Sequence, residues 1–410
     1  MTDVRALLDV RRRPSREEDE WRASSTELFF DLVFVLVVGQ LSAYLHEHLS
    51  PRGAAETLFL LLVAWWAWLN TTWATNWFDP ARGPVRGVLV VAMLASMLGA
   101  AAIPDAFGER ALLLVVGYVS IQTVRNAFAV LATRRDDPLH RPLVRVFAWT
   151  LWVGPLWLTG ALVDHDARLV VWAIALACDY AGPALGHWTP GLGRSDPSEW
   201  ELEPGHFAER LMLFLIIALG ETIVAAGVTA SGLELTGARL ASLMVAFGVA
   251  VALWWLYFDF HAEHTLLHLR AAAGYRGRLA RDLGYLLIPL VAGIIVSAVA
   301  SEIVIAHPHA RLDGDEVVTL AAGPALYLLG SVALKVRVYR DLWQPRAVAL
   351  VVVIATAVLG ASLPALAIWT LMLATLVGVA IAEVRQARRR AGTTGTPIGR
   401  GGDPVALSRP

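Results

Sequence analysis

The sequence predicts an all-α, polytopic integral membrane protein with about twelve transmembrane helices, arranged as two parallel six-helix repeats. Of the 410 residues, 57% are hydrophobic and only 17% are charged, whereas a soluble domain carries about 45–50% apolar and about 25% charged residues. Apolar stretches recur along nearly the whole chain, and the basic residues gather in alternate loops. This composition excludes a disordered or fibrous protein and disfavours an ordinary cytosolic enzyme.

Twelve apolar stretches are candidates for membrane spans. They are residues 28–46, 57–77, 87–104, 111–131, 146–163, 168–186, 207–229, 238–260, 283–304, 317–334, 347–362 and 364–382. A span needs about 20 predominantly apolar residues, so twelve spans use roughly 240 residues and leave only short loops. The last two stretches are separated by little more than Ser362, Leu363 and Pro364, so a count of eleven stays open.

Polar segments divide these stretches into two halves. We expect a cytoplasmic segment at 1–26, a first repeat at 27–186, a cytoplasmic loop at 187–205, a second repeat at 206–384 and a basic, disordered tail at 385–410. The first apolar run is long and lacks a cleavage pattern, so it is expected to remain as the first span.

The distribution of basic residues supports an even number of spans. If both termini and every second loop are cytoplasmic, that side receives 27 Arg and Lys residues and the opposite side receives five. This asymmetry is what the positive-inside rule requires. The formal net charge of -1 gives no indication of nucleic-acid binding.

Short motifs recur in the two halves. The segment VGQL at 38–41 resembles LGET at 219–222, and AWWAWLN at 64–70 resembles LWWLYFD at 253–259. Trp65 and Trp66 then correspond to Trp254 and Trp255. Six helices in each half make the repeats parallel. Chance similarity between apolar helices is the alternative.

Two carboxylates stand near the start of the first span. An ionisable group inside a bilayer costs at least about 2.5–3.5 kcal/mol on insertion scales, so each needs a reason. Glu27 and Asp31 are four residues apart and share a helix face. Glu27 is either a functional carboxylate or a helix-start residue beside a cap at Ser25 or Thr26. Asp31 lies one turn deeper, among three phenylalanines.

The seventh span carries the largest set of ionisable residues. His206, Arg210 and Glu221 fall on one stripe of the predicted helix, but Arg210 lies about 16 Å from Glu221 along the axis. The partner of Glu221 must therefore come from another helix, with Arg125 of the fourth span as a candidate. A structural intramembrane ion pair is the alternative.

Three histidines follow the eighth span. His261, His264 and His268 share one helix face and form a weak candidate for a metal site. A solvated helix end explains them as well, because the segment is expected at the cytoplasmic interface. No motif in the sequence indicates a cofactor.

Three motifs resemble the bacterial low temperature requirement protein A family: STELFFDLVF at 25–34 (followed by VLVVGQLSAYL), HFAERLMLFLIIALGETIVAAG at 206–227 and WWLYFDF at 254–260. The resemblance covers residues 27 to 383. It implies a multi-pass protein of the bacterial inner membrane associated with growth in the cold, but no biochemical activity. Its motif residues here are Glu27, Asp31, Gln40, His206, Glu209, Arg210, Gly220 and Glu221.

A second resemblance concerns the first span alone. FFDLVF is similar to the FSDGVF signature of a potassium-channel family, in which apolar side chains of the first helix form the pore constriction. By this resemblance Phe29, Val33 and Phe34 are candidates for a constriction. Phe30 stands where that signature has serine.

These observations lead to a channel or transporter for an ion or small solute as the first hypothesis. Glu27, Asp31 and Glu221 are the expected cation- or proton-binding residues, and Arg125, His206, Glu209 and Arg210 their counter-charges or polar partners. A non-transporting protein that supports membrane integrity or a partner complex in the cold is the alternative. An enzyme using the histidines is disfavoured. The expected partners are the lipid bilayer and the solute, with a homodimer left open.

Overall fold

The protein is all-helical in the part of the chain that the computed structural model describes, which comprises residues 10–11, 22–200, 202–259, 262–272, 274–339, 343–360 and 362–394. No β-strand occurs among these residues. The result follows from long apolar runs with no polar alternation, because a helix satisfies all its backbone hydrogen bonds within one segment.

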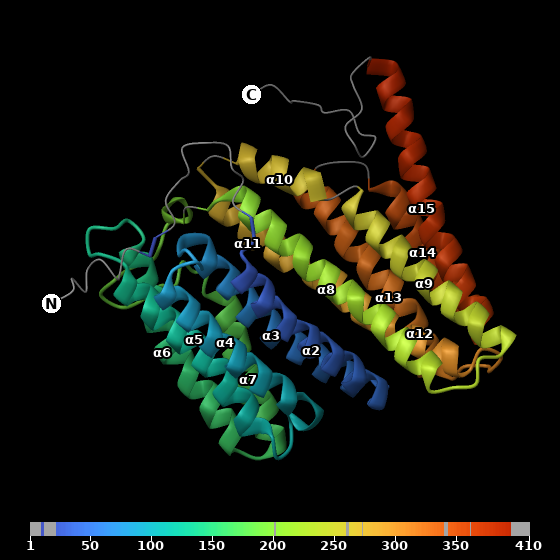
Figure 1. Ribbon diagram of the computed structural model, residues 1–410, viewed down its shortest axis with the longest axis horizontal. Helices are drawn as coiled ribbons and strands as arrows, with labels where there is room; N and C mark the ends of the chain where they lie inside the picture. Colours follow the sequence, from blue (N-terminus) through green and yellow to red (C-terminus); the bar gives the residue numbers. More distant parts are fainter. Residues whose placement is uncertain are drawn as a thin grey trace. The chain divides into compact units, whose positions relative to one another are not determined.

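Each of the twelve predicted stretches contains a helix (Figure 1). The long helices are α2 (Ser25–Glu47), α3 (Pro51–Trp77), α4 (Gly83–Ala102), α5 (Ala111–Ala132), α6 (His140–Leu162), α7 (His165–Ala181), α8 (Pro204–Ser231), α9 (Gly237–Phe258), α12 (Ile288–Ala306), α13 (Gly314–Leu334), α14 (Gln344–Leu359) and α15 (Ala365–Thr394). Shorter elements are η1 (Ile103–Asp105), η2 (Pro197–Glu199), α10 (Ala262–Ala271), α11 (Arg276–Leu286) and the π-helical η3 (Lys335–Tyr339).

Nine helical segments of the described residues are long and apolar enough to cross a bilayer. They are α2, α3, α4 with η1, α5, α8, α9, α11 with α12, α13 with η3, and α15. The helices α6, α7 and α14 fall outside this group, α7 and α14 because they have only 17 and 16 residues. The chain is therefore a multi-pass membrane protein.

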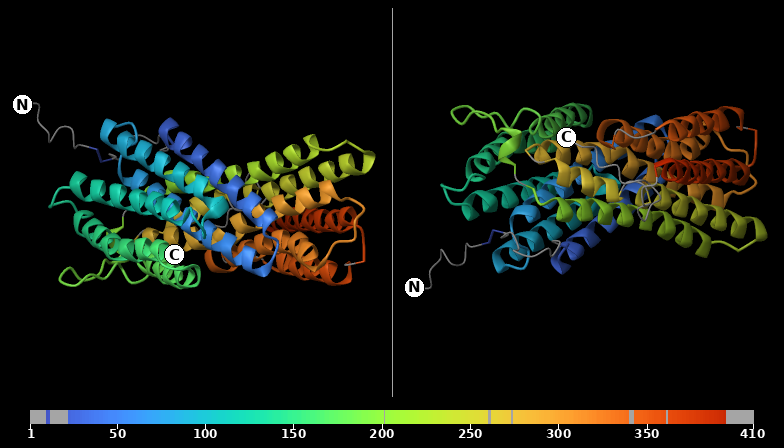
Figure 2. Two further views of the ribbon diagram at one scale, coloured as in Figure 1. Left: turned by 90° about the horizontal axis from the view of Figure 1, so that it is seen from below. Right: turned by 90° about the horizontal axis from the view of Figure 1, so that it is seen from above.

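The chain forms two compact units. Of the described residues, those within 10–44, 52–217 and 269–285 belong to unit 1, and those within 45–51, 218–268 and 286–394 belong to unit 2. The boundary between the two units falls inside α8, after Ile217. In unit 1, α4 packs against α5, α5 against α6 and α6 against α7. Two further views of the chain are given in Figure 2.

Unit 2 is built around α12. This helix is buried along most of its length and packs against α13, α9 and α15, while α14 packs against α13 and α15. The backbones of α12 and α13 approach closely at Gly293, where an added Cβ would lie 2.6 Å from the backbone nitrogen of Tyr327. Small residues at helix interfaces permit such approach in membrane proteins.

Two features of the fold concern segments discussed in the sequence, the matched tryptophans and the C-terminal segment. Trp65 and Trp66 are 1% and 5% exposed, whereas the residues matched to them, Trp254 and Trp255, are 45% and 44% exposed. The corresponding motifs therefore occupy different environments. Helix α15 continues to Thr394, into the segment expected to be a disordered tail, and the rest of that tail lies outside the described residues.

The close contact at Gly293 gives a stability prediction. Gly293→Ala should lower the free energy of unfolding by about 1–3 kcal/mol, because two backbones would have to separate. Gly378→Ala in α15 is the matched control, since nothing lies within 4 Å of its added Cβ, and alanine is the better helix former. Thermal unfolding of both variants in the same detergent measures the difference; equal stability would contradict the packing at α12 and α13.

Candidate functional site: a buried charge network on α2, α3 and α8

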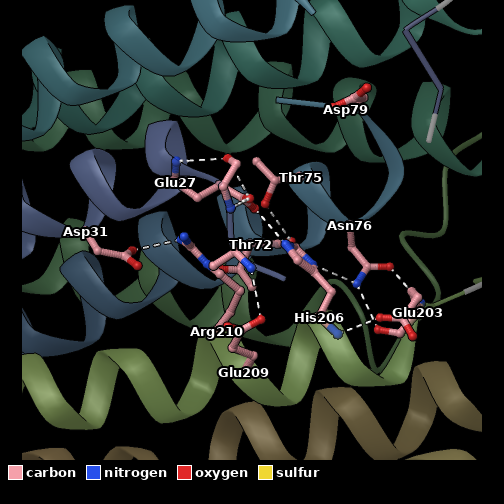
Figure 3. Close-up of polar contacts among 12 residues, drawn as sticks. Glu27, Asp31, Thr72, Thr75, Asn76, Asp79, Glu203, His206, Glu209 and Arg210 are labelled. Carbon is pink, nitrogen blue, oxygen red and sulfur yellow. Dashed lines mark hydrogen bonds and ion pairs between the residues drawn. The ribbon is translucent and has the colours of Figure 1, made fainter. Parts of the chain in front are cut away.

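Two buried polar pairs join α2 to the first half of α8 within unit 1 (Figure 3). Glu27 pairs with His206 and Asp31 with Arg210, and the partners in both pairs are 179 residues apart in sequence. A step of four residues along α2 thus matches a step of four along α8. The two helices therefore run parallel and in register at the site.

Glu27 uses its two carboxylate oxygens for different tasks. Oε2 accepts hydrogen bonds from the backbone N–H and the hydroxyl of Ser24, both at 2.9 Å, while the Ser24 hydroxyl accepts from the Glu27 backbone N–H. This is a capping box, which satisfies two free N–H groups at the helix start. Oε1 lies 2.7 Å from Nε2 of His206. The cap is Ser24, not Ser25 or Thr26, and Glu27 is both the helix-start residue of this capping box and a contact of His206 on α8.

The tautomer of His206 follows from its neighbours. Oδ1 of Asn76 accepts from the backbone N–H of Glu203, and its Nδ2 donates to the Glu203 carbonyl, so the orientation of the amide is fixed. Nδ2 then faces Nδ1 of His206 at 3.2 Å, which must accept. The imidazole is therefore neutral, with its proton on Nε2, and it donates to Glu27. Both side chains are fully buried.

Asp31 and Arg210 form a pair that is only partly satisfied. Oδ1 of Asp31 accepts from Arg210 Nη2 and from Trp68 Nε1, both at 2.8 Å. The guanidinium also lies over the Trp68 ring, 5.7 Å from its centroid. Oδ2 of Asp31 and both Nε and Nη1 of Arg210 are buried without a hydrogen-bond partner, although buried polar atoms normally have one.

Other predicted residues take different positions around this network. Glu209 accepts a hydrogen bond from the backbone N–H of Ala23, which ties the segment before α2 to α8. Phe34 is buried and contacts the Phe214 ring, with centroids 6.2 Å apart. Phe29 is 60% exposed and Val33 is half-buried, so the three candidates for a constriction differ in their surroundings.

Glu221 lies in unit 2, on the second half of α8. It is buried and within electrostatic range of Glu302 on α12. Glu302 accepts a hydrogen bond from Thr229 at 3.4 Å, and His46 lies 4.0 Å from it. The carboxylates of Glu221 and Glu302 therefore lie near each other in unit 2.

Arg125, the proposed partner of Glu221, belongs to unit 1. Its guanidinium donates to Gln122, Thr71 and Asn126, all of them neutral. The structure thus gives Arg125 a separate hydrogen-bond network, on α5 and α3.

The histidine cluster lies on α10. His264 and His268 stand beside the Tyr339 ring, with centroids 5.9 and 5.3 Å away, and His261 lies outside the described residues. Across the residues that the structure describes, no group of three or more His, Cys, Asp and Glu side chains is placed to hold a metal ion.

The neutral members of the network were not predicted from the sequence. Trp68 is one of three tryptophans within four residues of α3, and nothing distinguishes the one that donates to Asp31. Asn76 is a polar side chain near the end of a span, a signal that could have located it. In unit 2, Glu383 was also missed, although it accepts a bidentate contact from Arg346 and pairs with Lys335 at 2.9 Å.

With this geometry in place, the family can be identified. The family model of the bacterial low temperature requirement A protein (LtrA) matches residues 22–381. This chain belongs to the LtrA family. The resemblance seen in the sequence motifs is thereby confirmed, and both buried pairs lie in the matched part of this LtrA protein.

One relative from a known organism is also similar. This LtrA chain is 35% identical over 319 residues to the uncharacterized protein RA0937 of Rhizobium meliloti (strain 1021), covering 77% of this chain and 78% of the relative. No solved structure matches it.

The Asp31–Arg210 pair gives a second stability prediction. Asp31→Leu should cost about 3–5 kcal/mol of unfolding free energy, because it leaves the Arg210 charge buried without a counter-charge. The double variant Asp31→Leu/Arg210→Met should recover most of that loss. In the exposed pair of Arg134 and Asp136, the change Asp136→Leu should cost no more than about 1 kcal/mol. Thermal unfolding of the four proteins tests this; a single variant as stable as Asp136→Leu would contradict the burial of the pair.

Proposed function

We propose that this protein is a channel or transporter for a cation or a small cationic solute, with the α2–α8 network at its pathway. The observation that carries the proposal is the buried and incompletely satisfied pair of Asp31 and Arg210. Ionisable side chains in membrane helices are expensive and commonly mark ion or substrate pathways. The proposal assigns the chain no enzymatic reaction and no nucleic-acid partner.

The unsatisfied atoms separate this network from a purely structural ion pair. A structural pair gains most when all its hydrogen-bonding groups are paired, since a partly satisfied polar network is less favourable than an apolar core. One acceptor on Asp31 remains available for a cation or for a water of its hydration shell, and two donors on Arg210 remain available for water. The site thus has hydrogen-bonding capacity that the protein itself does not use.

The charge balance favours cations over anions. Glu27 and Asp31 carry two negative charges, Arg210 carries one positive charge, and the neutral tautomer of His206 carries none. The excess negative charge lies in a low-dielectric region, where it attracts a cation more strongly than in water. Within unit 2, Glu221 and Glu302 are two further carboxylates that could bind a cation or a proton.

We further propose twelve spans in two parallel repeats, in the bacterial inner membrane, with both termini in the cytoplasm. The count of 27 basic residues against five in alternate loops supports this topology. The parallel direction of α2 and α8 also supports it, because these are the first helices of the two halves and six spans separate their starts.

Ion flux in proteoliposomes tests the proposed function. The wild type should pass potassium, sodium or protons, and Asp31→Asn or Glu221→Gln should lower the flux at least about tenfold, the change that 1.4 kcal/mol in a barrier produces. Asp136→Asn, in an exposed loop, is the control and should keep the wild-type flux.

The alternative is a non-transporting protein that supports membrane integrity or a partner complex. In that case the same variants would change thermal stability and no ion would pass. If the wild type is folded and correctly oriented but passes none of the three ions, the proposal is overturned in favour of this alternative.

A further inference from the structure

A second polar site lies inside unit 1, away from the α2–α8 network. A narrow crevice runs between α3, α5, α6, α7 and the turn after α7. Its lining on α6 extends from Val146 to Trp157, about three helical turns or ~16 Å. Its volume is only about 20 Å³, and since a water needs about 10–15 Å³ on this scale, the crevice holds one or two waters and no larger solute.

Asp179 of α7 lines this crevice and is buried, with 8% of its surface exposed. Its Oδ2 accepts hydrogen bonds from the Tyr118 hydroxyl at 2.6 Å and from Trp157 Nε1 at 2.9 Å. No described residue donates to Oδ1. Oδ2 is therefore held by two neutral donors, whereas Oδ1 remains available to water in the crevice.

A positive charge lies in the same crevice without touching Asp179. Arg125 donates to the side-chain oxygen of Gln122, Gln122 donates to the Tyr118 hydroxyl at 2.9 Å, and Tyr118 donates to Asp179. Two neutral side chains thus separate the guanidinium from the carboxylate. A structural pair would bring the charges into direct contact, as Arg346 and Glu383 are in unit 2.

We propose that Asp179 is a proton-binding site, reached by water through this crevice. A hydronium ion in the crevice gives its proton to Oδ1, which forms an O–H bond and leaves a neutral water. Tyr118 and Trp157 keep their contacts with Oδ2, and Arg125 supplies the charge that favours release of the proton. The site shares no residue with the α2–α8 network, so it goes beyond the proposed function and does not depend on it.

Other titratable groups around the crevice hold fixed states near neutral pH. Arg stays protonated at any physiological pH, and Tyr and Cys hold their protons there. Burial of the His187 ring in the turn after α7 lowers its pKa to about 4, so this imidazole is neutral above that pH. The groups that face Asp179 or adjoin it from α5, α7 and this turn are Tyr118, Arg125, Cys178, Tyr180 and His187. α3 and α6 contribute no titratable side chain to the lining.

Infrared difference spectroscopy of the full chain in lipid nanodiscs tests the proposal. Lowering the pH should produce the C=O band of a buried protonated carboxylic acid, which shifts in heavy water because the crevice is wet. Asp179→Asn should remove this band, and Asp136→Asn should keep it. If Asp179→Asn shows the same C=O bands as the wild type, the proposal is overturned.

Tyr118→Phe provides a second test, which can be used even if Asp179→Asn does not fold. Removing a donor to the ionised carboxylate favours the protonated form, so the midpoint of the band should move to higher pH by roughly one unit. Thermal unfolding should confirm that the variant is folded. A midpoint that stays in place or moves to lower pH would contradict a proton-binding role for Asp179.

Discussion

The interior of this protein is organised by one constraint: a charge placed among membrane helices must find a compensating group. Glu27 and Asp31 can be buried on α2 only because α8 presents His206 and Arg210 at the same four-residue spacing. A slip of one turn would bring Glu27 to Arg210 and leave Asp31 without a counter-charge. The pairs therefore determine the register of two parallel helices, as single buried polar residues do in coiled coils.

Much of the fold could be predicted from hydrophobicity, because a span needs only length and apolar composition. Every predicted stretch contains a helix, and only α6, α7 and α14 fall short of the length or composition of a span. The boundary of the compact units inside α8 depends on which helices pack together, and hydrophobicity does not show this. The tryptophans show the same limit: Trp65 and Trp254 share a motif, yet one is buried and the other exposed.

The candidate site was predicted in part. The cost of burying charge drew attention to Glu27, Asp31, His206 and Arg210, and the structure brings these four together. Their pairing could not be predicted, because it depends on which face of α8 meets α2. Trp68 and Asn76 were missed for a related reason: they carry no charge, so only the folded arrangement shows that they orient the groups that do.

The spacing of 179 residues between partners has a consequence for synthesis. At about 5–20 residues per second, the ribosome completes His206 and Arg210 roughly 10 to 35 s after Glu27 and Asp31. Helix α2 must therefore wait in the membrane with carboxylates whose final partners do not yet exist. The capping box at Ser24 gives Glu27 a local partner during that interval, whereas Asp31 has only Trp68, which follows 37 residues later. The two carboxylates of α2 thus acquire their partners on α8 only when about half of the chain has been synthesised.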